Sequence, residues 1–212
     1  MTTLHRVRQE RGHSMTRTRI AFLAAFAFIA SASPAFAHLD PGEHGSFMAG
    51  FSHPLFGTDH ILAMVAVGLW AALLGGRSLW LVPLAFVGTM LIGFLAAVAG
   101  VPLPFVEPVI LASVVVIGLL AAVALNVPTG VAMAMVGFFA FFHGHAHGGE
   151  IGNAGAYAYA AGFAVATAFL HAAGVAAGLF LGKLFGGNTG RAVTRAAGAF
   201  TALGGVLLAI GG

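Results

Sequence analysis

Six long apolar stretches, separated by short segments rich in Gly, Pro and charged residues, make up most of this sequence after its first fifty residues. They cover approximately residues 54–74, 79–99, 108–125, 129–147, 156–184 and 193–210. A helix needs about 20 apolar residues to cross the hydrocarbon core of a bilayer. Only 7% of the chain is charged, far below the roughly 25% of an average soluble domain. The sequence therefore predicts an all-α polytopic membrane protein with six transmembrane helices.

The N-terminal part has the three regions of a secretory signal peptide. Five of the nine Lys and Arg residues lie before Ile20, residues 20–30 are apolar, and Ala35-Phe36-Ala37 supplies the small residues of a cleavage site. The alternative is an uncleaved first transmembrane helix. Ser and Pro at positions 31–34 argue against it, because they interrupt a stretch already shorter than a span requires. We expect residues 1–37 to be a cleavable signal peptide.

Cleavage at this point would leave an extracytoplasmic segment, residues 38–52, ahead of a six-helix transmembrane domain, residues 53–212. The basic residues of that domain would then all flank inside loops, as the positive-inside rule requires: Arg77, Lys183, Arg191 and Arg195. This pattern predicts a multi-pass protein of the bacterial cytoplasmic (inner) membrane. Without the leader the chain is nearly neutral, with four basic and five acidic residues, so no composition signal supports a nucleic-acid partner. The absence of cysteine excludes disulfides and thiolate metal sites.

The segment FHGHAHGGE, which begins at Phe142, ends the fourth apolar stretch. On a helix, His143, His147 and Glu150 share one face, whereas His145 points to the opposite side. Ionisable side chains at membrane depth usually line a water-filled pathway or bind a ligand. Two imidazoles and a carboxylate suit a divalent ion such as nickel, cobalt or zinc. The alternative is a His- and Gly-rich outer loop that contacts water.

A second polar segment, HPLFGTDH, begins at His53 and opens the first apolar stretch. On a continuous helix His53 and His60 would project from nearly one face, about 10 Å apart along the axis. Counting spans of about 20 residues places Asp59 and His60 in the outer part of the membrane, at the level of His143 and His147. The alternative makes His53 and Asp59 polar helix-end residues at the headgroup level.

These two segments resemble the two signatures, HxxxxxDH and FHGxAHGxE, of the HupE/UreJ family of hydrogenase and urease accessory permeases. Both signatures match without a departure, and the leader and six helices extend the resemblance over nearly the whole chain. The resemblance implies a secondary transporter, not an enzyme, that imports Ni2+ or Co2+ for metalloenzyme assembly and holds no permanent cofactor. It also implies which residues transport requires: His53, Asp59, His60, His143, His147 and Glu150.

Two further histidines give weaker signals. After cleavage, His38 would offer an α-amino group and an imidazole to one ion, as a capture site. The alternative is a solvated tail. His171 lies near the middle of the fifth apolar stretch, where it is either a relay ligand for the ion or a hydrogen-bonded packing residue.

Two other functions also fit parts of the sequence. An intramembrane zinc-dependent hydrolase would use His and Asp to hold zinc, with Glu150 or Glu107 to activate water. A metal sensor or assembly subunit would carry a sizeable soluble domain, which the sequence does not contain. Nickel, cobalt and zinc share these ligand types.

Overall fold

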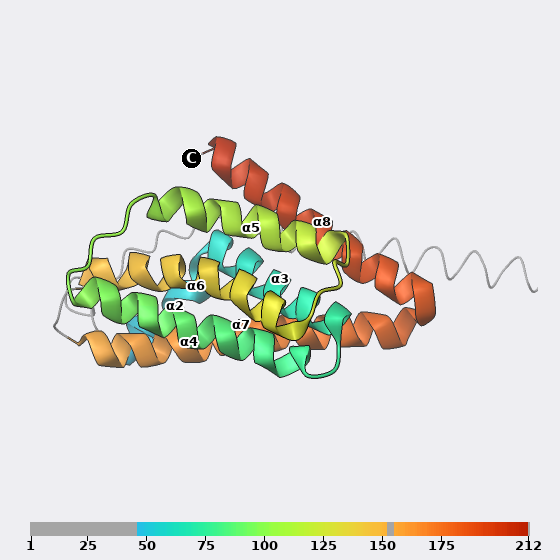
Figure 1. Ribbon diagram of the computed structural model, residues 1–212, viewed down its shortest axis with the longest axis horizontal. Coiled ribbons are helices and arrows are strands. Elements are labelled where there is room, and N and C mark those ends of the chain that lie inside the picture. Colours follow the sequence, from blue (N-terminus) through green and yellow to red (C-terminus); the bar gives the residue numbers. More distant parts are fainter. Residues whose placement is uncertain (1–45, 152–154, 212) are drawn as a thin grey trace, which may run out of the picture. The chain divides into compact units, whose positions relative to one another are not determined.

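The computed structural model describes residues 46–151 and 155–211, which form helices joined by short connections (Figure 1). In this part of the chain there are seven helices and no strand: α2 (Phe47–Phe56), α3 (Thr58–Leu74), α4 (Ser78–Val98), α5 (Val106–Ala122), α6 (Thr129–Ile151), α7 (Ala156–Phe185) and α8 (Gly187–Gly211). The predicted all-α class is therefore confirmed for these ranges. The predicted signal peptide lies outside the described residues. Helix α2 begins within the segment that was expected to precede the transmembrane domain.

Four helices, α4, α6, α7 and α8, are long and apolar enough to cross a bilayer. Helices α2 and α3 meet this requirement only together, as a pair bent by 81°, and α5 is shorter, with 17 residues. The described part of the chain thus contains four candidate spans, or five with the bent pair. This architecture is that of a multi-pass membrane protein, while the number of six spans stays a prediction.

Gly57 divides the first predicted span into two helices. Its backbone is extended, with φ −77° and ψ 114°, and its N–H donates to the carbonyl of His53. Glycine favours such an interruption, and an acidic residue, here Asp59, favours the first turn of the helix that follows. The prediction that His53 and His60 lie about 10 Å apart along one helix is therefore wrong. The bend brings their ring centroids to 5.7 Å.

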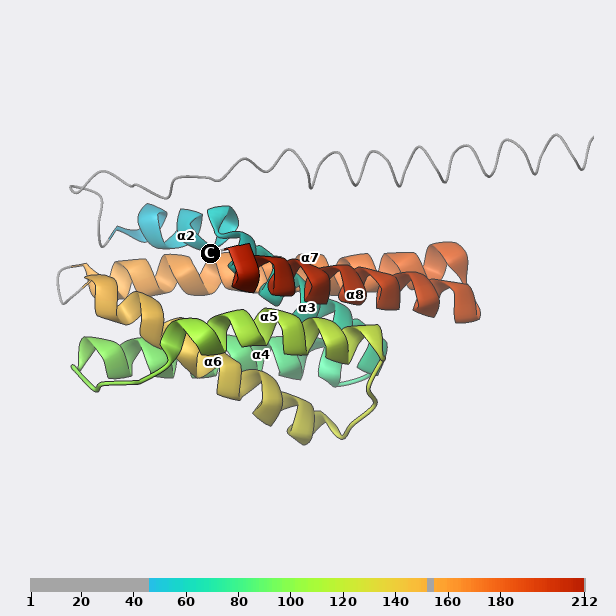
Figure 2. The same cartoon turned by 90° about the horizontal axis from the view of Figure 1, so that it is seen from above.

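Glycines allow three pairs of helices to approach backbone to backbone. Between α4 and α6, a Cβ atom at Gly93 would collide with the backbone of Phe141. Between α3 and α7, a Cβ at Gly68 would collide with the backbone of His171. Between α2 and α7, a Cβ at Gly50 would meet Tyr159, and Figures 1 and 2 show α2 alongside the first half of α7. These close approaches fix the helices that carry the histidines.

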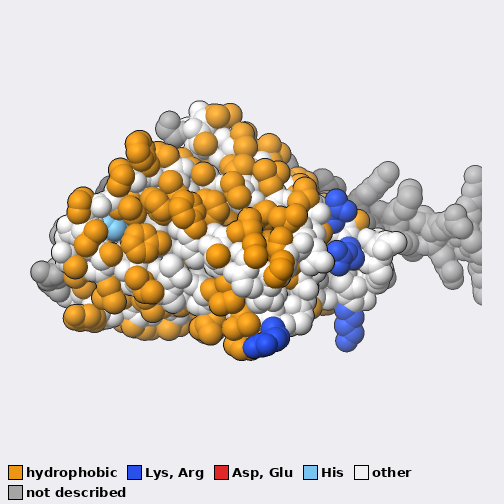
Figure 3. Space-filling view, in the orientation of Figure 1, with side chains coloured by type: hydrophobic (Ala, Val, Ile, Leu, Met, Phe, Trp, Pro, Cys, Tyr) orange, Lys and Arg blue, Asp and Glu red, His pale blue; other side chains and the backbone are white. Residues whose placement is uncertain are grey.

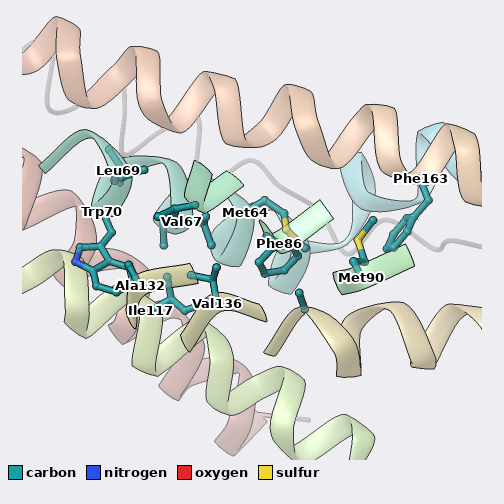
Figure 4. Packing of buried hydrophobic residues seen from close by; sticks show 14 of the residues in the cluster. Met64, Val67, Leu69, Trp70, Phe86, Met90, Ile117, Ala132, Val136 and Phe163 are labelled. Atoms are coloured by element: carbon teal, nitrogen blue, oxygen red, sulfur yellow. The ribbon is translucent and has the colours of Figure 1, made fainter. Parts of the chain in front are cut away.

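The buried apolar core lies between α3, α4, α5, α6 and α7 (Figure 4). Trp70 of α3 is fully buried there, and its indole N–H donates to the carbonyl of Leu125 at 2.9 Å. Apolar side chains also cover much of the face seen in Figure 3, and large apolar side chains such as Trp80, Ile92 and Phe138 are exposed. An apolar core inside an apolar surface is what a bilayer-embedded bundle requires.

The close approach of α4 and α6 predicts that Gly93→Ala destabilises the bundle, because the added methyl group has to push the α6 backbone away. We expect a cost of about 1–3 kcal/mol, seen as a lower unfolding temperature of the purified protein in detergent. Gly88→Ala is the matched control on the same helix, since a Cβ there meets no atom within 4 Å. Equal unfolding temperatures for the two variants would contradict the packing described.

Candidate metal site

Three imidazoles from three helices, α2, α3 and α6, converge at one place. His53 comes from α2, His60 from α3 and His147 from α6. Each can present one ring nitrogen such that all three nitrogens lie within 4.8 Å of one another. His60 and His147 are buried and His53 is half-buried. We call these three residues the His cluster.

The shortest contact in the His cluster joins His60 and His147. Their Nε2 atoms lie 2.8 Å apart, and the ring of His53 packs at 4.4 Å, centroid to centroid, from that of His147. Nitrogen ligands about 2.0–2.1 Å from a tetrahedral metal ion are separated by roughly 3.3 Å. Small ring rotations, with a change of tautomer that removes the proton from the contact between the two Nε2 atoms, would therefore convert this cluster into a three-nitrogen coordination site.

Asp59 orients His60 from the other side of its ring. The Oδ2 atom of Asp59 lies 3.0 Å from Nδ1 of His60. A carboxylate beside Nδ1 favours the proton on that nitrogen, which leaves the lone pair of Nε2 facing His147. A Cβ at Gly57 would lie 3.1 Å from both Asp59 Oδ1 and His60 Nδ1. Glycine at the helix break thus leaves room for this pair.

His143 lies one turn before His147 on α6 and is fully buried. Its ring centroid is 5.2 Å from that of His60, so the prediction that His143 and His147 share one face of the helix is confirmed. Ser113 of α5 donates its only hydroxyl proton to the carbonyl of Ile110 at 2.6 Å, and its Oγ lies 2.8 Å from Nε2 of His143. Ser113 must then accept from His143 Nε2–H.

This tautomer leaves the lone pair of His143 on Nδ1. Among the described side chains, that nitrogen has no hydrogen-bond partner, so it is available to a cation. Ser113 lies in neither of the two sequence motifs. The only sign of its role in the sequence is that it is a single hydroxyl residue within an apolar stretch. Its hydrogen-bond partner, His143 on α6, is thirty residues away.

The remaining candidate residues lie either away from the His cluster or outside the described part of the chain. His145 lies off the His cluster, as its helical spacing predicts, and its Nε2 donates to the carbonyl of Val101 at 2.7 Å. The side chain of Glu150 and the whole of His38 lie outside the described residues. His171 is buried on α7 and is not part of the His cluster; its ring packs against Phe86.

Comparison with known proteins agrees with these motifs. A family profile described as HupE / UreJ protein matches residues 26–208. The chain belongs to the HupE/UreJ family. It is also 45% identical, over 184 residues, to Protein HupE of Rhizobium leguminosarum bv. viciae, in a match that covers 86% of this chain and 94% of that protein. No solved structure matches the chain.

Membership confirms the resemblance stated on the two motifs. The HupE/UreJ family comprises metal transporters and accessory proteins, not enzymes. The zinc-hydrolase alternative therefore has no support.

The contact between Ser113 and His143 predicts that Ser113→Ala weakens metal binding. Loss of the acceptor frees the ring to change tautomer and orientation, and such supporting contacts typically contribute about 10–100-fold in affinity. Titration of the purified protein with Co2+, followed by its absorption spectrum, measures the change. Ser78→Ala is the control, because Ser78 is equally buried but bonds Thr129, which begins α6 far from its histidines. Unchanged affinity in Ser113→Ala would contradict the assigned role.

Proposed function

We propose that this chain is a permease that imports a divalent transition-metal ion, Ni2+ or Co2+, across the cytoplasmic membrane. The observation that carries this proposal is the His cluster, in which both family motifs contribute imidazoles to one site inside an apolar helical bundle. Imidazole and carboxylate ligands suit borderline divalent ions. The metal is the cargo, and no permanently bound cofactor is needed.

The distribution of charge supports the orientation that import requires. The Lys and Arg side chains in view gather at one end of the described bundle (Figure 3). His147 packs on Phe163 at 4.9 Å, and Lys183 lies twenty residues further along α7, roughly 30 Å away at 1.5 Å per residue. Basic residues mark the cytoplasmic side. The His cluster then faces the extracytoplasmic side, where it can capture the ion.

The membrane potential suffices to drive uptake. A divalent cation moving inward gains about 4.6 kcal/mol for each 100 mV, twice the roughly 2.3 kcal/mol of a single charge. The ion also has to leave the site, so a few neutral ligands serve better than a closed cage. Three imidazoles from separate helices meet this condition, because a small movement of one helix removes one ligand.

In this proposal the His cluster captures the ion, Asp59 and His143 act beside it, and Glu150 completes the ligand set. His38 gives the mature N-terminus a first binding site after removal of the signal peptide. The six predicted spans carry the pathway. Family membership supports delivery of the metal to hydrogenase or urease maturation as the cellular role.

Metal accumulation in cells tests this function directly. A host without its own nickel and cobalt uptake systems would express the wild type, His147→Ala or Asp59→Asn at equal membrane levels. We expect the wild type to raise cell-associated nickel or cobalt, measured by elemental mass spectrometry, and both variants to return it to the level of the empty vector. His147→Ala removes a ligand, and Asp59→Asn removes the charge that orients His60.

His145→Ala is the matched control for these variants. It removes an imidazole from the same helix that bonds Val101 instead of the His cluster, so import should persist. Failure of the correctly inserted wild type to accumulate either metal would refute the uptake function. The metal that accumulates most would identify the cargo.

The orientation has its own test, because the chain contains no cysteine and a single substitution therefore introduces the only thiol. In intact spheroplasts, a membrane-impermeant maleimide should label Pro104→Cys, in the connection between α4 and α5. It should label Asn126→Cys, between α5 and α6, only after the membrane is opened. The reverse pattern would place the His cluster on the cytoplasmic side.

A further inference from the structure

His171 has an environment that packing alone does not explain. It lies halfway along α7, and its side chain is only 1% exposed. Within the part of the chain that the structure describes, neither of its ring nitrogens has a hydrogen-bond partner. A buried polar group without a partner costs free energy, so an apolar side chain of similar size would stabilise the helix bundle better. The imidazole is therefore expected to have a ligand.

The position of His171 on α7 relates it to the His cluster. The ring of His147 packs on Phe163, and His171 lies eight residues further along the same helix, roughly 12 Å closer to the Lys183 end at 1.5 Å per residue. Positions 163, 167 and 171 are one helical turn apart and share a face. His171 thus lies on the Lys183 side of the His cluster, on the face of α7 that the His cluster contacts.

His143 and Phe86 connect the two levels. The ring of His143 lies 5.2 Å from that of His60, one turn of α6 deeper than His147. Phe86 of α4 contacts both His143, at 5.7 Å, and His171, at 4.9 Å between ring centroids. The face of an aromatic ring attracts cations. A continuous series of rings therefore runs from the His cluster through His143 and Phe86 to His171.

Further donor atoms lie beside His171. Thr167, one turn earlier on α7, is buried and donates its hydroxyl proton to the sulfur of Met90 at 3.7 Å. Met90 and Phe86 are one turn apart on α4 and both point into the buried core (Figure 4). The hydroxyl oxygen keeps lone pairs after this bond. One imidazole nitrogen with a neighbouring oxygen and thioether suits a borderline divalent ion that is held weakly.

We propose that His171 forms a second metal-binding position, on the cytoplasmic side of the His cluster, that holds the ion in transit. This proposal rests on the import function proposed above and deepens it. An ion that leaves the His cluster passes to Nδ1 of His143 and then to a ring nitrogen of His171. Each position offers few protein ligands, so the ion can leave each of them, as conduction through several sites requires.

A count of bound metal tests this position independently of transport. The wild type, His171→Leu and His147→Ala would be purified in lipid nanodiscs and equilibrated with radioactive Co2+. We expect His171→Leu to bind one cobalt ion fewer per chain than the wild type and to retain the tighter site. His147→Ala should lose the tighter site and retain the weaker one. An equal count in the wild type and His171→Leu would overturn the proposal and assign the imidazole to packing or to a buried water.

Stability and transport kinetics separate a metal ligand from a structural residue. His171→Leu removes a buried group that has no protein partner, so its unfolding temperature should equal or exceed that of the wild type. Its maximal rate of cobalt uptake should nevertheless fall by at least about tenfold, with the half-saturating concentration little changed. A parallel loss of stability and uptake with an unchanged cobalt count would establish a structural role instead. If the wild type imports neither metal, the import function fails, while the cobalt count still decides whether His171 binds metal.

Discussion

The structure of the site depends on the imidazole of His60, which has a defined neighbour at each ring nitrogen. Asp59 lies at Nδ1 and His147 at Nε2. The first contact is local to α3, and the second joins α3 to α6 across 87 residues of sequence. The bend at Gly57 then brings His53 to the same place from α2. One oriented ring therefore holds together the two sequence motifs.

Helical periodicity and span counting predicted much of this arrangement, because both are local properties. The spacing of four residues placed His143 and His147 on one face, and the structure confirms it. The bend at Gly57 could not be predicted in the same way. The polar segment around it was expected to continue one helix, and the chain contains 31 glycines, so one glycine carries no distinctive signal. The role of Ser113 also escaped prediction, because it depends on which face of α5 meets α6.

The interior of the bundle contains both closely packed backbone contacts and buried polar nitrogens. Between α4 and α6, and between α3 and α7, glycines bring backbones into direct contact and leave no room for a Cβ atom at positions such as Gly93 and Gly68. The same helices carry His143, whose buried Nδ1 lacks a hydrogen-bond partner among the described residues, and His171, for which both ring nitrogens lack one. Close packing supplies the stability that such buried polar groups reduce. The protein can thus keep nitrogen lone pairs in an apolar interior without losing its fold.

Because the three imidazoles of the His cluster come from different helices, a bound ion would also connect those helices. Helix α2 packs on α7, whereas α6 packs on α4, and α6 and α7 have few direct contacts. An ion bound by His53 and His147 would join these two packed pairs in the manner of a removable crosslink. Its arrival would restrict their relative motion and its departure would release them, since a ligand stabilises the arrangement that binds it. The cargo would thereby regulate the rigidity of its own carrier.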